Sequence, residues 1–491
     1  MHLGARTAIR FAGNIRTRLD PMEIEEFRIK AHAMVDWMAD YMSNVDQYPV
    51  RAQTTPGQIA AKLPEVPPAS RESVDAIMAD FERDILPGVT HWQHPRFFAY
   101  FPANSSPPSV LAEMLTATIG AQCMLWQTSP AATEMETRIT DWLRQMIGLP
   151  TGFHGVIQDS ASSAILCAIL TGRELATNWR SNEVGLTNTS PVVIYTSDQT
   201  HSATEKGAKV AGLGRSNVRI IPSDSETFAM KPDALEEAIL ADKAAGKLPA
   251  CVVDNLGSTG VGAMDDLEAI GKIAQRHGLF SHVDAAWAGS ALILEEHRHL
   301  LKGIERFDSF VFNPHKWLMT NFDCTAHFVR DPEALVKTLS INPTYLLSRE
   351  GEGVIDYRDW SVPLGRRFRA LKLWFVIRSY GVDGLKAIIR NHIELAKWLE
   401  EQISCERDFE LMAPRQLSLI NFRYVPEDAE DFDSLNARLL NAVNDDGLTY
   451  LTQNVIGGAY AIRFQIGQTM TQQEHVDAAW QRIRSISKKI R

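Results

Sequence analysis

The 491-residue chain lacks several features that mark large classes of proteins. Its five cysteines are scattered and odd in number, and no two form a C-x-x-C pair, which argues against a disulfide framework or a zinc ribbon. No apolar run reaches the length of a membrane span, because the richest stretch, 110–126, is broken by Glu113 and Gln122. The formal net charge of −10 provides no basic excess for nucleic acid. We therefore expect a cytoplasmic protein whose partners include neither membrane nor nucleic acid.

Other absences bear on cofactors. A nicotinamide-binding fold would carry G-x-G-x-x-G after a strand, but "GSTGVG" at 257–262 lacks that spacing and the later ribose-binding acid. The histidine pairs His91/His94 and His297/His299 have the residue type of metal ligands, yet nothing completes a site around either pair. We interpret these histidines as structural and predict no metal.

The composition is that of a globular protein, with 45% hydrophobic and 22% charged residues and a length that suits two or three domains. The first nineteen residues contain four arginines and no acid. Residues 1–21 are therefore expected to be an extension outside the fold, either a transit peptide or a translated segment upstream of Met22. Residues 22–105 show helical spacing, a proline-rich connector and a capped helix, which predict a helical segment that packs on something else.

From about residue 106, short β-branched runs alternate with helical stretches. The runs are "PVVIYTS" at 191, "NVRIIPS" at 217, "ACVVDN" at 250, "LFSHVDAAW" at 279 and "SFVFNPH" at 309. This alternation predicts an α/β fold with a mainly parallel sheet in a large domain at 106–375. A long helix near 366–380 leads into a smaller α+β domain at 376–491. In such sheets, ligands bind at the carboxyl ends of the strands.

Four strand ends, one in "GVIQDS" at 155 and three in the runs above, carry polar residues of one pattern. Ser160, Ala161 and Ser162 start a helix after a strand, where hydroxyls and free N–H groups suit an anion. His201 follows the next strand, Asp284 closes another, and Lys316 comes one step past Asn-Pro-His. Taken singly, each has an ordinary explanation: a helix cap, a structural histidine, a paired carboxylate and a surface lysine.

Taken together, they match the needs of pyridoxal phosphate. The phosphate needs an anion site, the ring needs a flat cover such as His201, and the ring nitrogen needs a carboxylate such as Asp284 to keep its proton. The aldehyde needs an amine, and a lysine among apolar neighbours loses hydration, which makes its amine easier to free. Lys316 supplies that amine.

The stretch "HVDAAWAGSALILEEHRHLLKGIERFDSFVFNPHKWLMTNFDCTA" resembles the core of the group II pyridoxal-phosphate decarboxylases, closest to the aromatic-L-amino-acid decarboxylases. The resemblance runs from about Met22 and includes "LPGVTHWQHPRFFAYFPANSS", "SPAATEMET" and "DYRDWSVPLGRRFRALKLWFVIRSYG". It implies a fold-type I homodimer with active sites at the subunit interface. It also implies carbon dioxide release from an aromatic L-amino acid (tryptophan, DOPA, tyrosine or phenylalanine) to give the amine.

The resemblance assigns roles by motif. Lys316 carries the cofactor, Asp284 pairs with the ring nitrogen and His201 stacks on the ring. The expected cofactor-binding residues are Ser160, Ala161, Ser162, His201, Thr259, Asp284, Ala286, Asn313, His315 and Lys316. The expected substrate-binding residues are Tyr100, Phe101, Pro102, Trp126 and Gly365.

Two positions bear on the substrate. At the position of Gly365, relatives that act on bulky aromatic substrates tend to have glycine, whereas histidine decarboxylases tend to have serine. The glycine of this chain therefore favours a substrate with a large ring. Met124 replaces a phenylalanine that aromatic-specific members often have, which loosens the aromatic lining of the pocket.

The segment "SINPTYLLSREGEGVIDYRDW" resembles the mobile catalytic loop of the family, and its Tyr345 falls on the catalytic tyrosine, the expected proton donor to the substrate carbon. An aromatic aldehyde synthase on the same scaffold remains an alternative, although such relatives usually have phenylalanine at that position. A decarboxylase of a non-aromatic amino acid is a second alternative, which Gly365 disfavours. A pyridoxal-fold transcription regulator would need a basic helix-turn-helix, and none is visible.

Overall fold

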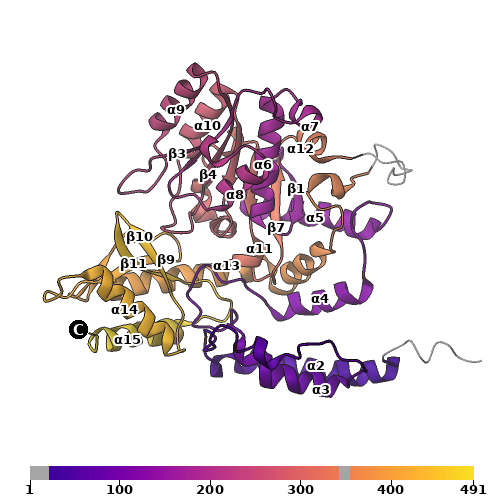
Figure 1. The fold of residues 1–491 in the computed structure, drawn as a ribbon, viewed down its shortest axis with the longest axis vertical. Helices are drawn as coiled ribbons and strands as arrows, with labels where there is room; N and C mark the ends of the chain where they lie inside the picture. Colours follow the sequence, from indigo (N-terminus) through magenta and orange to yellow (C-terminus); the bar gives the residue numbers. More distant parts are fainter. Residues whose placement is uncertain (1–21, 342–353, 491) are drawn as a thin grey trace, which may run out of the picture. The chain divides into compact units, whose positions relative to one another are not determined.

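The structure is a computed structural model, and it describes residues 22–341 and 354–490 (Figure 1). The chain divides into two compact units, Met1–His91 and Trp92–Arg491. Among the described residues, no helix combines the length and apolar character needed to cross a membrane.

The first unit is helical, as its sequence predicts. Ser73 begins the second α-helix by accepting a hydrogen bond from the Ala76 N–H at 3.2 Å, which satisfies one of the free donors at the helix start. The first α-helix buries none of its residues in this chain, although it carries several large apolar side chains. The elements are α2 (Ile24–Asn44), η1 (Val45–Gln47), η2 (Ala60–Lys62), α3 (Val74–Asp80), η3 (Phe81–Ile85) and η4 (Leu86–Gly88).

The second unit is built around a seven-stranded sheet of order β1-β7-β6-β5-β4-β2-β3. Its strands are β1 (His154–Gln158), β2 (Val192–Ser197), β3 (Val218–Ile221), β4 (Leu248–Asn255), β5 (Phe280–Asp284), β6 (Ser309–Phe312) and β7 (Thr325–Val329). Strands β3, β2, β4, β5 and β6 run parallel, whereas β7 is antiparallel to both of its neighbours, β6 and β1. The prediction of a mainly parallel α/β sheet is confirmed. Strand β7 was not predicted.

Helices cover both faces of this sheet. On one face, Ile165 and Ala168 of α6 (Ala161–Ala176) pack with Val253 of β4, and α8 (Ala203–Val210) joins the same cluster. On the other face, Leu235 of α9 (Pro232–Ala244) and Ile270 of α10 (Leu267–His277) join the largest core. The apolar faces of these amphipathic helices therefore form two cores, one on each side of the sheet. The further helices are α4 (Pro107–Ile119), α5 (Pro130–Ile147), α7 (Ser181–Val184), α11 (Pro314–Trp317) and α12 (Pro332–Leu339), with the 3-10 segments η5 (Arg215–Asn217), η6 (Ala288–Ile293), η7 (Glu295–Leu301), η8 (Ile304–Arg306) and η11 (Tyr357–Trp360).

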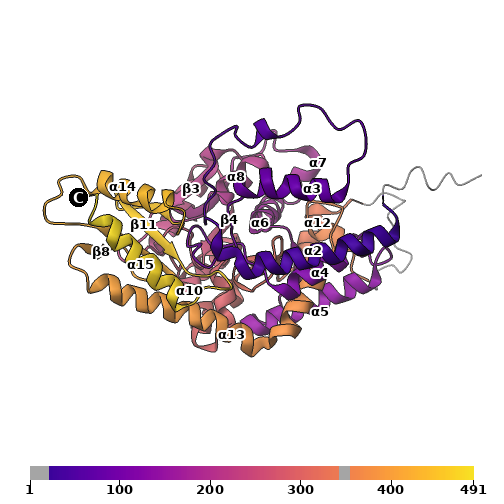
Figure 2. The ribbon, with the colours of Figure 1, turned by 90° about the horizontal axis from the view of Figure 1, so that it is seen from below.

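A long helical element, α13 (Arg369–Ser404), joins this sheet to the C-terminal part of the unit (Figure 2). It is broken at Gly381, whose φ of 64° and ψ of 165° are not helical and suit a residue without a Cβ. The C-terminal part has an antiparallel sheet of order β10-β11-β9-β8, and its core includes Phe422, Phe464 and Trp480. Its elements are β8 (Phe409–Leu411), β9 (Leu419–Tyr424), α14 (Phe432–Asp445), β10 (Thr452–Ile456), β11 (Ala459–Gln465) and α15 (Gln473–Ser487).

Candidate active site

The carboxyl ends of the central strands open into a cavity of about 170 Å³. It lies where polar residues follow β1, β2, β4, β5 and β6, which is the edge at which parallel sheets bind ligands. Most of the predicted cofactor residues line it: Ser160, Ala161, Ser162, His201, Thr259, Asp284, Ala286, Asn313 and Lys316. Residues separated by more than 150 positions in sequence thus meet around one small space.

The start of α6 forms one wall of the cavity. Ser160 begins this helix, and its Oγ accepts a hydrogen bond from the Ser163 N–H at 3.3 Å. A helix leaves its first N–H groups without partners inside the helix, and its dipole places partial positive charge there. Together with the Ser160 and Ser162 hydroxyls, this wall is suited to a phosphate group.

His201 lies between β2 and α8 on another wall. Its Nδ1 accepts a hydrogen bond from the Ala203 N–H at 3.1 Å, which orients the ring. Loss of hydration lowers the pKa of His201, and nearby Lys316 lowers it further, whereas Asp284 acts in the opposite direction. The residue is exposed in this chain. A flat, neutral imidazole can therefore stack on a planar ligand here.

Asp284 and Lys316 are an acidic and a basic side chain of the cavity lining. Asp284 ends β5, is buried, and accepts a hydrogen bond from the Ala286 N–H at 3.0 Å. Lys316 is in the short helix α11 after β6 and is only partly exposed. Burial lowers the pKa of Lys316 and outweighs the neighbouring carboxylate of Asp284, which raises it. The amine is thus biased towards its neutral, nucleophilic form.

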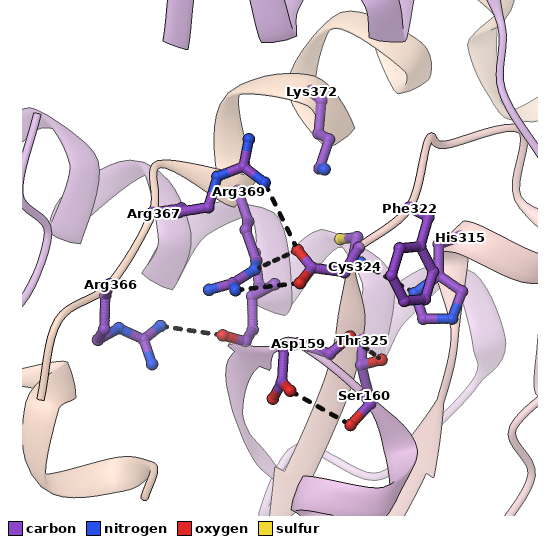
Figure 3. Close-up of polar contacts among 12 residues, drawn as sticks. Asp159, Ser160, His315, Phe322, Cys324, Thr325, Arg366, Arg367, Arg369 and Lys372 are labelled. Carbon is purple, nitrogen blue, oxygen red and sulfur yellow. Dashed lines mark hydrogen bonds and ion pairs between the residues drawn. The ribbon is translucent and has the colours of Figure 1, made fainter. Parts of the chain in front are cut away.

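Two residues beside Lys316 have different positions. Asn313 is buried, lines the cavity, and accepts a hydrogen bond from the Thr325 hydroxyl at 2.8 Å. His315 does not line the cavity. Its Nδ1 accepts a hydrogen bond from the Cys324 N–H at 2.9 Å, burial lowers the pKa of His315 to about 3, and the exposed ring of Phe322 lies beside it (Figure 3). In this chain, His315 therefore holds the turn that follows α11.

The predicted substrate residues fall into two groups. Phe101 is buried, stacks on Trp287 with ring centroids 5.5 Å apart, and so backs the cavity wall; Pro102 is buried next to it and Tyr100 is exposed. Trp126 and Gly365 line two other pockets, neither of which shares a residue with the cavity. One chain therefore does not bring all five predicted substrate residues together.

Several residues of the cavity were not predicted. They are Ile165, Ala203, Asn255, Gly257, Ser258 and Trp287. Trp287 was visible as the aromatic residue that follows the small residues of "HVDAAW". Asn255 carried no comparable signal, because its amide works through contacts far along the chain, donating to the hydroxyls of Ser197 at 3.0 Å and Thr200 at 2.9 Å.

Asn104 was also missed, although it holds the lysine in place. Its side-chain nitrogen donates to the carbonyl oxygen of Lys316 and to that of Gly467, the latter at 2.7 Å. Its own backbone N–H donates to the carbonyl of His315 at 2.9 Å. Tyr345, the predicted proton donor, lies outside the described residues.

The residues present fit pyridoxal phosphate. The helix start accepts an anion, the imidazole covers a ring, the carboxylate meets a protonated nitrogen and the amine meets an aldehyde. Among the described residues, no cluster of histidine, cysteine or acidic side chains suits a metal ion. The chemistry of this donor set is that of a pyridoxal-phosphate enzyme.

Comparison with known proteins agrees. The family model described as "Pyridoxal-dependent decarboxylase conserved domain" matches residues 56–425. Tyrosine decarboxylase 1 from Narcissus pseudonarcissus is 42% identical over 482 residues, covering 95% of this chain and 93% of that protein. Phenylacetaldehyde synthase from Arabidopsis thaliana is 43% identical over 473 residues, covering 94% of this chain and 96% of that protein.

A solved structure of Oryza sativa TDC with PLP and tryptamine superposes with a TM-score of 0.93 at 36% identity, covering 96% of this chain and 99% of that one. The chain therefore belongs to the family of pyridoxal-dependent decarboxylases. Its large sheet and the smaller C-terminal part have the fold-type I arrangement of these enzymes, and its cofactor is pyridoxal phosphate.

Proposed function

We propose that this protein decarboxylates an aromatic L-amino acid to the corresponding amine and carbon dioxide. The observation that carries the proposal is the meeting of the Lys316 amine and the Asp284 carboxylate in one cavity that Trp287, backed by Phe101, walls with aromatic rings. The names of the relatives support the aromatic substrate class, because they describe a tyrosine decarboxylase, a phenylacetaldehyde synthase and a structure with tryptamine.

Pyridoxal phosphate supplies an aldehyde that bonds to an amine with loss of water, and a ring that accepts the electron pair left when carbon dioxide departs. The residues of the chain supply the rest. Lys316 would offer a neutral amine, Asp284 would hold a proton at the ring nitrogen, and His201 would cover the ring. The start of α6 would hold the phosphate, and the stacked Phe101 and Trp287 would exclude water from the aromatic wall of the cavity.

Labelling and product analysis test this function. Borohydride reduction of the loaded protein should fix the cofactor to the peptide that contains Lys316, and Lys316→Ala should abolish turnover. The purified protein should release carbon dioxide and amine in equal amounts from at least one of tryptophan, tyrosine, DOPA and phenylalanine. Label on a different lysine would overturn the assignment, and turnover of only non-aromatic amino acids would overturn the substrate class.

An aldehyde-forming activity is a second candidate, because a phenylacetaldehyde synthase is 43% identical to this chain. The presence of Tyr345 supports the amine-forming reaction, since a hydroxyl can return a proton to the substrate carbon. Measuring amine, aldehyde and hydrogen peroxide together distinguishes the two: a decarboxylase makes mainly amine, and an aldehyde synthase makes aldehyde and peroxide in air.

We further propose that the enzyme is a homodimer whose active sites use residues of both chains. The separation of Trp126 and Gly365 from the cavity supports this, because a second copy can bring them to it. The exposed apolar side chains of α4 support it too: Leu111 is 52% exposed, Leu115 45% and Ile119 60%. An apolar surface of this kind favours burial against another chain.

Subunit complementation tests the shared site. Lys316→Ala and Gly365→Trp should each be inactive alone, the second because a large ring blocks the substrate position. Mixed dimers should regain about a quarter of wild-type activity, because half of the randomly assembled dimers hold one intact site. Lys316→Ala mixed with Asp284→Asn is the matched control, since both residues line the cavity of one chain and neither site of the mixed dimer is intact. Equal recovery in both mixtures, or none in the first, would contradict the shared site.

A further inference from the structure

Arg463 of β11 is a buried cation without an acidic partner. Only 3% of its surface is exposed, and among the described residues no carboxylate forms an ion pair with it. The buried Arg366 and Arg358 differ in this respect, because they pair with Glu136 and Asp359. A buried charge that is not neutralised is costly, so its retention calls for a role that the charge itself serves.

The guanidinium of Arg463 holds one residue that lines the candidate active site, Thr259, and the backbone of Tyr100, which precedes the buried Phe101. Its Nε donates to the carbonyl of Thr259 at 2.7 Å, and its Nη1 donates to the carbonyl of Tyr100. Thr259 lines the cavity. Tyr100 has a φ of 50°, a left-handed conformation that is strained for a residue with a side chain and persists only where the surroundings hold it.

Anchoring alone does not require a charge. Next to Thr259, the carbonyl of Gly260 accepts a hydrogen bond from the side-chain amide of Asn421 at 3.2 Å. A neutral amide on β9 thus donates a hydrogen bond to the Gly260 carbonyl, just as the arginine on β11 donates one to the Thr259 carbonyl. The positive charge of Arg463 therefore needs a separate explanation.

The charge acts on Lys316. Arg463 and Lys316 lie at the same cavity, because the Thr259 carbonyl that accepts from Arg463 belongs to a residue of the lining that includes Lys316. Asp284 at the end of β5 and Arg463 from the C-terminal sheet act on Lys316, and Lys316 in turn lowers the pKa of His201 and of His315. Burial is the main cause that lowers the pKa of Lys316, and Arg463 lowers it further, while Asp284 raises it. Burial lowers the pKa of Arg463 itself to about 9, so the group is charged at neutral pH.

We propose that Arg463 is a positioning residue of this site: its guanidinium fixes Thr259 in the cavity lining and the backbone at Tyr100, and its unpaired charge keeps the Lys316 amine neutral and ready to bond to the cofactor aldehyde. The inference rests on the function proposed above only for the identity of the aldehyde. The protonation of Lys316 can be followed in the apoenzyme, without cofactor or substrate.

Competitive labelling with acetic anhydride tests the charge. Apoenzyme is labelled over a range of pH and the extent of acetylation of Lys316 is compared, by peptide mass spectrometry, with that of exposed lysines such as Lys206. In the wild type, Lys316 should begin to react at lower pH than Lys206. A Lys316 that titrates together with the exposed lysines would overturn the proposal without any variant.

Two variants separate the charge from the hydrogen bonds. Arg463→Gln removes the charge but keeps amide donors, so labelling of Lys316 at neutral pH should fall by about tenfold for each unit by which the pKa rises. Arg463→Lys keeps the charge but loses the second donor group, so labelling should stay near wild type while the KM for the substrate rises and kcat changes less. Asn421→Ser is the matched control, because it loosens the same loop without a change of charge.

The outcomes are distinct. Unchanged labelling of Lys316 in Arg463→Gln, or an equal fall in Asn421→Ser, would show that Arg463 only anchors the loop and would overturn the role of its charge. An unchanged KM in Arg463→Lys would overturn the positioning role. Thermal unfolding of each apoenzyme verifies that the variants are folded when they are labelled. The labelling readout needs neither substrate nor turnover, so its failure is separable from failure of the proposed function, and KM is measured with whichever amino acid the enzyme turns over.

Discussion

Glu136 and Arg366 together satisfy both backbone groups of Ile157. The carboxylate of Glu136 accepts the Ile157 N–H at 2.8 Å, and the guanidinium of Arg366 donates to the Ile157 carbonyl at 3.0 Å. The two side chains are buried and also pair with each other. Because β1 is the edge strand of the sheet, this ion pair occupies the side on which a further strand would bind.

Glu136→Ala should destabilise the protein strongly. It leaves the buried Arg366 without its carboxylate, and breaking a buried pair in this way costs about 3–5 kcal/mol. We expect a lower urea midpoint for the apoenzyme, measured by circular dichroism. Glu237→Ala, on the exposed surface of α9, is the control. A midpoint no lower than that of the control would mean that the pair contributes little.

Asp284→Asn should retain cofactor and lose most of its turnover. The amide cannot hold a proton at the ring nitrogen by charge, and removing one preorganised charge of an active site costs about 10²–10³ in rate. Absorbance of the bound cofactor and kcat are the two measurements. A variant with full cofactor content and near-normal kcat would show that the carboxylate has no electrostatic role.

Asp254→Asn should make stability less dependent on pH. Asp254 on β4 is fully buried, neither of its oxygens has a hydrogen-bond partner among the described residues, and burial, with Asp265 nearby, raises its pKa well above the usual value. The folded state therefore keeps a proton that the unfolded state releases above about pH 4. The stability that this group contributes is complete below that pH and is lost as the pH rises towards the raised pKa.

In the wild type, the loss amounts to about 1.4 kcal/mol per pH unit over that window. The asparagine variant has no such proton, so its thermal midpoint should rise relative to the wild type as the pH increases from about 4 towards 8. Asp233→Asn, at an exposed position of α9, should show no such trend. Midpoints that differ from the wild type by the same amount at every pH would contradict the protonation of Asp254.

Tyr345→Phe should change the product more than the rate of substrate consumption. The substitution keeps the ring and removes only the hydroxyl that is predicted to return a proton to the substrate carbon, a contribution of roughly 10²–10⁴-fold. We expect the wild type to make mainly amine and the variant to make mainly aldehyde and hydrogen peroxide in air. The assay measures all three products with and without oxygen. Amine formed by the variant at the wild-type rate would rule out Tyr345 as the donor.

The strand ends were predictable because each combines a short β-branched run with a polar residue that the run delivers to one edge of the sheet. Strand β7 escaped prediction because His327 interrupts its apolar pattern. The structure explains how this strand tolerates a buried histidine. The two ring nitrogens of His327 form hydrogen bonds with Gln158 of β1 at 2.9 Å and Ser309 of β6 at 2.8 Å. These partners lie on other strands, so no local sequence pattern predicts the hydrogen bonds.

Arg463 and Asn104 escaped prediction for a related reason. Neither belongs to a motif of the cavity, and both act on backbone carbonyls, which every residue has. Their partners are distant in sequence, so only the folded chain reveals them. Trp126 and Gly365 present the opposite case, because a resemblance suggested them while a single chain leaves them apart.

The hydrogen bonds of Asn104 and Arg463 also set an order in time. A ribosome makes Lys316 well before Gly467 and Arg463, and chains fold from the N-terminus as they emerge. Until β11 has left the ribosome, the lysine lacks the cation that bears on it, and the Tyr100 and Thr259 carbonyls lack their donor. We therefore expect capture of the cofactor to follow the emergence of β11 from the ribosome. A messenger RNA truncated before β11 would yield a polypeptide that retains Lys316 but lacks Arg463 and Gly467.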